Sequence, residues 1–174
     1  MTKNYKEKLK DIQTLIFDVD GVFTDNTLYL IEGQQPMRKM NVKDGYALQL
    51  AVKSGYRIAV ITGGRSEAVR ERFLGLGVQD VFMGSQNKLA VFDQYISEHE
   101  LDPTHILYMG DDIPDRSVMK IVGLACCPQD ATDAVKEVSD YISYRKGGEG
   151  CVRDILEQLL RLHGHWLGPN SKEW

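Results

Sequence analysis

The sequence has few cysteines, no excess of positive charge and no long apolar run. Its 3 cysteines include no CxxC pair, which argues against a disulfide framework or a zinc site and favours reduced thiols. With 21 Lys and Arg against 25 Asp and Glu, the formal net charge of −4 disfavours general attraction to nucleic acid or anionic membranes. No stretch approaches the roughly 18 apolar residues of a membrane-spanning helix, and the charged N-terminus does not resemble a signal peptide. We therefore expect a cytoplasmic protein that binds neither nucleic acid nor membrane.

The pattern along the chain predicts one domain, residues 1–174, built from alternating strands and helices. Three apolar runs lack polar alternation, which is typical of strands covered on both faces of a sheet: Thr14–Val19, Arg57–Ile61 and His105–Met109. Weaker strand candidates cover residues 80–83, 123–126 and 141–143. Helical spacing of apolar residues predicts helices at 43–54, 66–76, 88–100, 114–122, 130–138 and 150–163. This alternation indicates an α/β fold with a doubly wound parallel sheet.

Two segments depart from the alternation. Residues 27–40 have the pattern of two short strands around a Gly33–Pro36 turn, so we predict a small β-hairpin inserted after the first strand. Residues 164–174 have little periodicity and are predicted to form a mobile tail. Because the interval between Asp20 and Thr62 holds only this hairpin and one helix, we expect no large cap domain.

Polar residues follow each of the three strong strand candidates. They are Asp18 and Asp20 after the first, Thr62 after the second, and Asp111, Asp112 and Asp115 after the third, with Lys88 opening a helix in between. In a doubly wound sheet these strand ends meet at one rim, where ligands bind. Crowded carboxylates take up protons or bind a cation, and an oxygen-rich site suits Mg²⁺, which often bridges to a phosphate. Each residue alone has an ordinary role in a turn or helix cap, but the set indicates metal-assisted phosphate chemistry.

The same residues carry a resemblance to a known family. The segments DVDGVFTD at 18–25 and GDDIPD at 110–115, together with Thr62 and Lys88, resemble the signature motifs of the haloacid dehalogenase superfamily of phosphatases. Further segments resemble the branch of that superfamily that acts on phosphorylated 2-keto-3-deoxy sugar acids: NVKDGY at 41–46, GSQNK at 84–88 and GGEGCVR at 147–153. The resemblance covers about residues 15–160 and implies 3-deoxy-D-manno-octulosonate 8-phosphate as substrate. A nine-carbon keto sugar acid 9-phosphate is the alternative.

The resemblance implies roles for the residues of the predicted site. Asp18 is expected to attack phosphorus and form an aspartyl-phosphate, while Asp20 protonates the departing sugar oxygen and then activates water. Thr62, the backbone N–H of Gly63, and Lys88 are expected to bind the phosphoryl oxygens. The implied Mg²⁺ ligands are the side chains of Asp18 and Asp111 and the backbone carbonyl of Asp20. For Asp112 and Asp115, an orienting role at the site and a helix cap or solvated acid both remain open.

Contacts to the sugar acid follow from the same resemblance. The implied contact residues are Asp20, Asn41, Lys43, Asp44, Gly45 and Arg72. Gln49 and Gly64 stand where members of the family carry arginine, so the choice between eight- and nine-carbon acids remains open. The resemblance also implies a homotetramer in which the hairpins meet and a neighbouring subunit closes each active site.

Two other functional classes deserve comparison. A signalling receiver domain also combines acids, Thr, Lys and Mg²⁺, but its phosphorylated Asp precedes the Thr and its Lys comes last, whereas Asp111 follows Lys88 here. A non-catalytic scaffold would not require an intact set of catalytic residues, yet Asp18, Asp20, Thr62, Lys88 and Asp111 are all present. The sequence therefore favours an enzyme, with the receiver and the scaffold as alternatives.

Overall fold

Six parallel strands form one sheet in the computed structural model, which describes residues 4–171. The strands are β1 (Thr14–Phe17), β2 (Arg57–Ile61), β3 (Asp80–Phe82), β4 (Ile106–Met109), β5 (Leu124–Cys127) and β6 (Tyr141–Ile142). Their order across the sheet is β3-β2-β1-β4-β5-β6, so the chain winds outward from β1 to one edge and then returns to wind toward the other. The register aligns Phe17 of β1 with Val60 of β2 and Met109 of β4, which brings the carboxyl ends of these three strands level.

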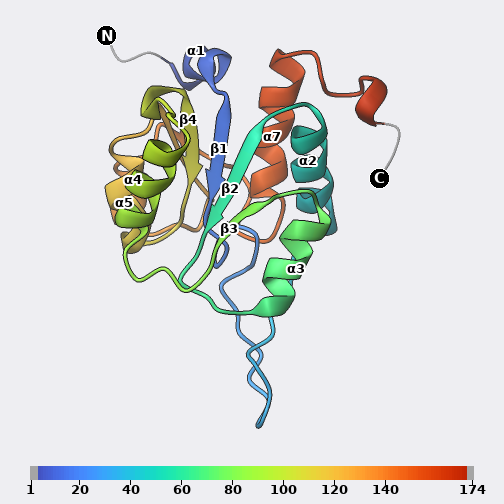
Figure 1. Ribbon diagram of the computed structural model, residues 1–174, viewed down its shortest axis with the longest axis vertical. Helices are drawn as coiled ribbons and strands as arrows, with labels where there is room; N and C mark the ends of the chain where they lie inside the picture. The colour runs from blue at the N-terminus through green and yellow to red at the C-terminus, as the bar shows by residue number, and fades with distance from the viewer. Residues whose placement is uncertain (1–3, 172–174) are drawn as a thin grey trace.

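Helices cover both faces of the sheet (Figure 1). They are α1 (Tyr5–Lys8), α2 (Val42–Lys53), α3 (Glu67–Gly75), α4 (Lys88–Glu98), α5 (Arg116–Met119), α6 (Asp133–Lys136) and α7 (Cys151–Leu162). One core lies between the sheet and α2, α3 and α7, and a second core lies between the sheet and α4, α5 and α6. The strand order and the helices on both faces confirm the predicted doubly wound α/β fold, and every residue of β1, β4 and β5 is buried as expected for central parallel strands.

The strand and helix boundaries differ from the prediction where turns compete with regular structure. The first strand ends at Phe17 because the carbonyl of Val19 instead accepts hydrogen bonds from the N–H groups of residues 22–24. The helix predicted at 114–122 divides into a 3₁₀ turn at Ile113–Asp115 followed by α5. The three cysteines are buried and form no disulfide, as expected for core thiols.

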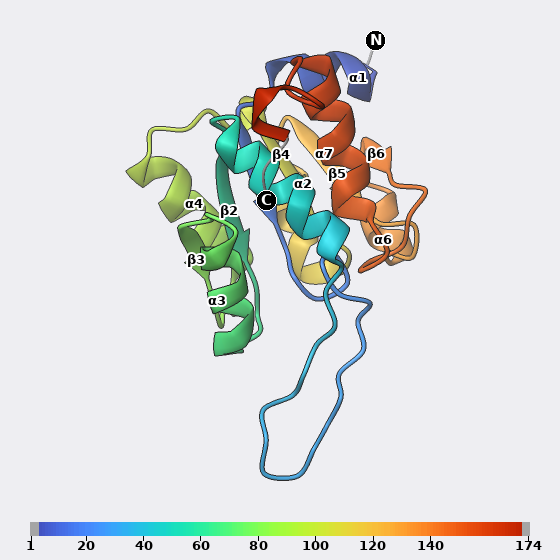
Figure 2. The same cartoon turned by 90° about the vertical axis from the view of Figure 1, so that its right-hand side faces the viewer.

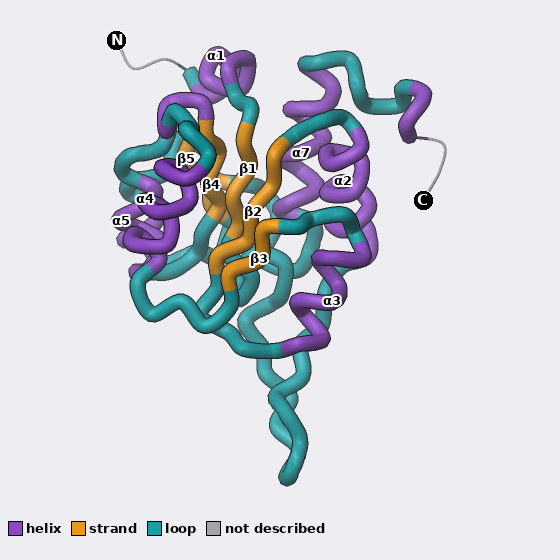
Figure 3. Tube along the Cα trace, viewed as in Figure 1, coloured by secondary structure: helices purple, strands orange, loops and turns teal. Residues whose placement is uncertain are grey.

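The segment 27–40, predicted as a β-hairpin, has less strand pairing than expected. This segment contains one antiparallel bridge, in which Tyr29 and Met37 exchange N–H···O bonds of 3.1 Å, and is otherwise a loop (Figure 3). The loop 27–40 extends away from the end of the sheet where β1 finishes (Figure 2). Its apolar side chains Leu28, Tyr29, Leu30, Ile31 and Met37 are 45–77% exposed, and a two-stranded ribbon without a surface to pack against is marginal in water.

The segment after α7 returns along α2. Within it, the backbone carbonyl of Ser171 accepts a hydrogen bond from Tyr46 Oη at 2.7 Å, and Asn170 Nδ2 donates to the carbonyl of Lys53 at 3.2 Å. Trp166 meets the Tyr46 ring edge-on. The predicted mobility of residues 164–174 stays a prediction, and residues 172–174 lie outside the described part of the chain.

The sequence predicted neither a large cap domain nor a membrane-spanning helix. Within residues 4–171 the only insertion between β1 and α2 is the loop 27–40, so the described chain has no large cap domain. Over the same residues, no helix has both the length and the apolar character needed to span a bilayer. The cytoplasmic location expected from the sequence stays a prediction.

Candidate active site

A cleft of about 270 Å³ lies beyond the carboxyl ends of β1, β2 and β4. This is the point where the winding direction of the sheet reverses, the usual ligand site of doubly wound folds. The cleft is lined by side chains that can act in catalysis or bind a ligand, among them Asp18, Asp20, Thr62, Lys88, Asp111 and Asp115. The strand-end residues predicted to converge therefore lie around one cavity, although they come from three different strands and one helix.

Lys88 lies between two of the carboxylates. Its Nζ is 2.6 Å from Asp115 Oδ1 and 2.9 Å from Asp18 Oδ2, and only 7% of the lysine is exposed. The lysine opens α4, whose N-terminus is capped by the side chain of Asn87. Burial lowers the pKa of Lys88 and the two carboxylates raise it, with a net increase. The lysine is thus held as a buried cation at the floor of the cleft.

Asp115 orients Lys88 rather than acting as a solvated acid. This fully buried carboxylate accepts hydrogen bonds from Lys88 Nζ, from Tyr108 Oη at 2.6 Å, and from the N–H groups of Asp111 and Asp112. Glycine is required at position 110, because a Cβ there would lie 2.4 Å from Cβ of Asp115. Four donors occupy both oxygens of Asp115, so the arrangement favours the orienting role that the sequence left open.

The turns after β1 and β4 meet at Asp111. Asp111 Oδ2 accepts a hydrogen bond from Asn26 Nδ2 at 2.8 Å. Gly21, with φ of +81°, lies against the same carboxylate, since a Cβ there would lie 2.0 Å from Oδ2. This close approach explains why the DVDG segment ends in glycine.

The carboxylates of Asp18, Asp111 and Asp115 could together hold a metal ion. One oxygen from each lies within 4.8 Å of the others. Burial is the main cause that raises the pKa of Asp18 to about 7 and that of Asp111 to about 6, so the ionised forms gain from a neighbouring cation. Because Asp115 is occupied by its four donors, Asp18 and Asp111 are the carboxylates best able to bind an ion. A donor set made only of oxygen fits Mg²⁺.

Asp20 and Thr62 flank the carboxylates. Asp20 is partly exposed and forms a two-point ion pair with Arg38 of the loop 27–40, with distances of 2.6 and 3.1 Å. Thr62 is buried, and its Oγ1 accepts a hydrogen bond from the N–H of Gly64 at 3.1 Å. Gly63 and Gly64 lie along the same wall of the cleft. Both predicted side chains therefore lie at the cleft, and Asp20 has a partner that was not expected.

Sequence reasoning missed three residues around the site: Asn26, Arg38 and Tyr108. A signal existed for Tyr108, because a tyrosine inside a fully buried strand needs a hydrogen-bond partner for its hydroxyl. No comparable signal existed for Asn26 or Arg38. Their partners, Asp111 and Asp20, are brought to them only by the packing of the turn and the loop.

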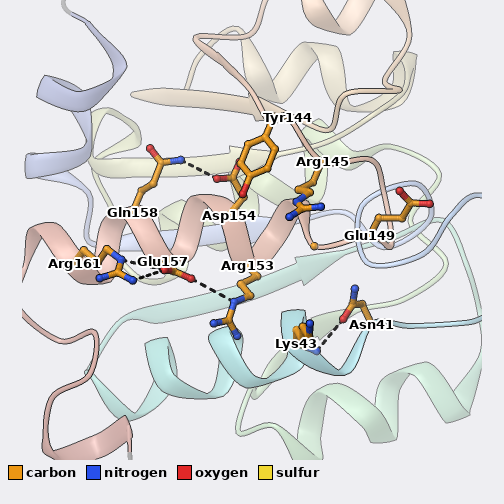
Figure 4. Close-up of a pocket in the computed structure, with 11 residues that line it drawn as sticks. Asn41, Lys43, Tyr144, Arg145, Glu149, Arg153, Asp154, Glu157, Gln158 and Arg161 are labelled. Carbon is orange, nitrogen blue, oxygen red and sulfur yellow. Dashed lines mark hydrogen bonds and ion pairs between the residues drawn. The ribbon is translucent and has the colours of Figure 1, made fainter.

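Two predicted sugar contacts, Asn41 and Lys43, lie in a different groove (Figure 4). This groove of about 500 Å³ runs between the start of α2 and α7, and Arg145, Arg153 and Glu157 also face it. It shares no lining residue with the catalytic cleft. Asn41 caps α2 by accepting from the N–H of Lys43 at 2.8 Å and donates to the carbonyl of Gly148 at 3.3 Å. Within this subunit, neither side chain lines the cleft of Asp18.

The other predicted sugar contacts are packed inside the protein. Asp44 is completely buried, and its Oδ1 accepts a hydrogen bond of 2.6 Å from the backbone N–H of Arg153, which caps the start of α7. Gly45 lies under the side chain of Arg72, because a Cβ there would lie 2.6 Å from Nη2 of that arginine. Asp44 therefore joins α2 to α7, and the predicted contact of this residue with a sugar stays a prediction.

We expect Asp44→Asn to flatten the pH dependence of stability. Burial raises the pKa of Asp44 to about 6, so its protonated form stabilises the fold below about pH 4 and this contribution is lost as the pH rises through 6. The difference from the ordinary pKa of 3.8 corresponds to a loss of roughly 3 kcal/mol in the free energy of unfolding as the pH rises. An asparagine, which does not titrate, should not show this loss. Denaturant unfolding at pH 4 and 7.5, with the exposed Asp133→Asn as control, measures it. If the free energy of unfolding of Asp44→Asn changed between pH 4 and 7.5 as much as that of the wild type, the raised pKa of Asp44 would be contradicted.

The parallel sheet, the carboxylates at its switch point and the buried lysine between two of them define a hydrolase with a site suited to phosphate esters. A family model described as haloacid dehalogenase-like hydrolase matches residues 66–153, and the chain belongs to this family. The predicted family is thereby confirmed.

The relatives are similar over nearly the whole chain. The 3-deoxy-D-manno-octulosonate 8-phosphate phosphatase of Salmonella typhi is 34% identical over 157 residues, covering 90% of this chain and 84% of the relative. The crystal structure of the corresponding phosphatase from Yersinia pestis has a TM-score of 0.91 and 30% identity, covering 95% of this chain and 90% of that one. A structure of the Moraxella catarrhalis phosphatase, in complex with a magnesium ion, a phosphate ion and 3-deoxy-D-manno-octulosonate (KDO), has a TM-score of 0.88 at 29% identity and covers 92% of each chain.

Proposed function

We propose that this protein is a Mg²⁺-dependent phosphatase that hydrolyses 3-deoxy-D-manno-octulosonate 8-phosphate to the free sugar acid and inorganic phosphate. The observation that carries the proposal is the convergence of Asp18, Asp20, Thr62, Lys88 and Asp111 on one cleft. The relatives described above, named for this reaction, support the choice of substrate. Membership of a hydrolase family favours this activity over the receiver and scaffold alternatives.

Two carboxylates divide the chemistry between them. Asp18 attacks the phosphorus through a carboxylate oxygen, the bond from phosphorus to the sugar oxygen breaks, and Asp20 gives that oxygen a proton. Water then attacks the phosphorus of the aspartyl-phosphate, Asp20 takes a proton from it, and the bond to Asp18 breaks to release phosphate. Asp20 is the more exposed of the two, which suits a group that exchanges protons with the substrate and with water.

The remaining residues hold the phosphoryl group in place. Thr62 and the N–H of Gly63 supply hydrogen-bond donors from one wall of the cleft, and Lys88 supplies a positive charge from its floor. Asp115 and, through it, Tyr108 keep the ammonium of Lys88 in position. Such preorganised charge is the main contribution that a protein makes to phosphoryl transfer.

The side chains of Asp18 and Asp111 would hold a Mg²⁺ ion, and the family resemblance implies the backbone carbonyl of Asp20 as a further ligand. The bound ion would reduce the repulsion between the carboxylate of Asp18 and the anionic ester. The raised pKa values of Asp18 and Asp111 are consistent with carboxylates that need a cation at neutral pH.

Steady-state hydrolysis of the eight-carbon 8-phosphate and a nine-carbon 9-phosphate, each with Mg²⁺ and with EDTA, tests the proposal. We expect the eight-carbon ester to have the higher kcat/KM, and chelation to lower its turnover by at least about 10²-fold. Restored Mg²⁺ should return the activity. A preference for the nine-carbon ester, or turnover that EDTA does not change, would contradict the proposal.

We infer that the active protein is a homotetramer in which the loops 27–40 meet and a neighbouring subunit helps to close each cleft. Five exposed apolar side chains lie on this loop, more than a solvated loop of this length needs. Replacing Leu30 and Ile31 by Ser should lower the mass measured by light scattering and also the activity. Leu167→Ser, at an equally exposed position far along the chain, is the control and should change neither. A monomeric wild type would contradict the inference.

A further inference from the structure

One basic residue of the loop 27–40 reaches back into the cleft. Arg38 Nε and Nη2 lie 2.6 and 3.1 Å from the two oxygens of Asp20, and Nη1 lies 3.3 Å from the carbonyl of Pro36. Although most of the loop is exposed, only 10% of the Arg38 side chain is. All three nitrogens of the guanidinium therefore have acceptors, and its orientation is determined.

Glycine at position 64 leaves room for this guanidinium. A Cβ at Gly64 would lie 3.2 Å from Nη2 of Arg38 and 3.5 Å from Oδ2 of Asp20. A larger side chain at this position would compete with Arg38 for the same volume. The cation beside Asp20 thus comes from the loop 27–40, and not from the turn after β2.

A second ion pair anchors the same arm of the loop. Lys39 Nζ lies 2.7 Å from Asp25 Oδ2, in the turn that follows β1. The side chain of Lys39 is 62% exposed, whereas that of Arg38 is 10% exposed. The two adjacent cations therefore differ in how firmly they can hold their carboxylate partners. An exposed pair contributes little, while a two-point arginine–carboxylate pair sets both the position and the plane of the acid.

We propose that Arg38 is a positioning residue that holds the carboxylate of Asp20 in its working orientation. The proposal rests on the proposed function, in which Asp20 transfers protons to the sugar oxygen and from water. Without Arg38, the carboxylate of Asp20 is free to rotate within a partly exposed turn. An error of about 1 Å in the placement of such a group lowers a rate by about 10²-fold. The loop 27–40 is thereby linked directly to the chemistry.

Three variants test the proposal: Arg38→Met, Arg38→Lys and, as matched control, Lys39→Met. For Arg38→Met we expect kcat to fall by about 10²-fold, with KM and the inhibition constant of inorganic phosphate within about 3-fold of the wild type. Arg38→Lys should recover part of kcat, because a single ammonium can still pair with Asp20. Lys39→Met removes a cation from the same arm and should change each constant by less than about 3-fold.

Other outcomes overturn the proposal. If Arg38→Met raises KM and weakens phosphate inhibition without lowering kcat, Arg38 binds substrate instead of positioning Asp20. Unchanged kinetics would mean that the ion pair has no role, and an equal loss in Lys39→Met would mean that the loop matters only as a whole. The same comparison with a simple alkyl phosphate, such as glycerol phosphate, separates the two proposals, because its alkoxide leaving group needs a proton from Asp20 even where the sugar acid phosphate is not the substrate.

Discussion

Asp18→Asn is expected to lower turnover of the sugar phosphate by at least about 10⁴-fold, the largest effect that one substitution should have here. The amide cannot act as the nucleophile, and it also removes a charge that a cation would share with Asp111. Lys88 keeps its pair with Asp115 at 2.6 Å, so the cleft should retain its shape.

Phosphate release measured over hours, together with thermal unfolding, checks this expectation. The unfolding midpoint should not fall, because burial raises the pKa of Asp18 to about 7 and the folded protein gains nothing from its ionisation. Asp93→Asn, an exposed acid on α4, is the matched control and should retain full activity. Turnover by Asp18→Asn near that of the wild type would exclude the aspartyl-phosphate route.

Lys88→Met should have the second largest effect, because it damages both catalysis and folding. Removal of the cation leaves Asp18 and Asp115 as buried carboxylates that lose their shared partner at 2.9 and 2.6 Å. Breaking a buried pair in this way typically lowers the free energy of unfolding by about 3–5 kcal/mol. The charge on the transferring phosphoryl group also loses a fixed partner, so we expect kcat to fall by about 10³-fold.

The pH dependence of that destabilisation gives a sharper test. Burial and the neighbouring acid already raise the pKa of Asp18 to about 7, so protonation below this pH should relieve the uncompensated charge. The stability lost in Lys88→Met should therefore be smaller at pH 5.5 than at pH 8. Chemical denaturation at both values measures it, with the exposed Lys120→Met as control. A loss that is equal at both pH values would argue against a buried charge as its cause.

Local patterns were sufficient to predict the strands at the centre of the sheet. The run at Arg57–Ile61 is the strand β2 itself, because residues buried on both faces must be apolar without alternation. The convergence of Asp18, Thr62 and Asp111 also followed from the sequence, since parallel strands align their carboxyl ends. The two arms predicted at 27–40 pair only at the bridge between Tyr29 and Met37, because a two-stranded ribbon is marginal in water and the apolar side chains of this segment are largely exposed.

The contacts that were not predicted join residues far apart in the sequence. Asn26 meets Asp111, Arg38 meets Asp20, and Asp44 caps the start of α7. No spacing rule links such partners, because their distance depends on how the turns and helices pack. Asp44 lies in a segment that resembles a substrate-binding motif, yet its burial shows that the same residue also joins two helices.

The amino-acid sequence alone determined the class of fold and which strand ends carry the reactive groups, because both depend on short-range periodicity and on the direction of parallel strands. Only the tertiary structure decided which donor each carboxylate receives: Lys88 and Tyr108 for Asp115, and Arg38 for Asp20. Those pairings depend on distances of a few ångströms between separate elements, and close packing of the whole chain is what sets such distances.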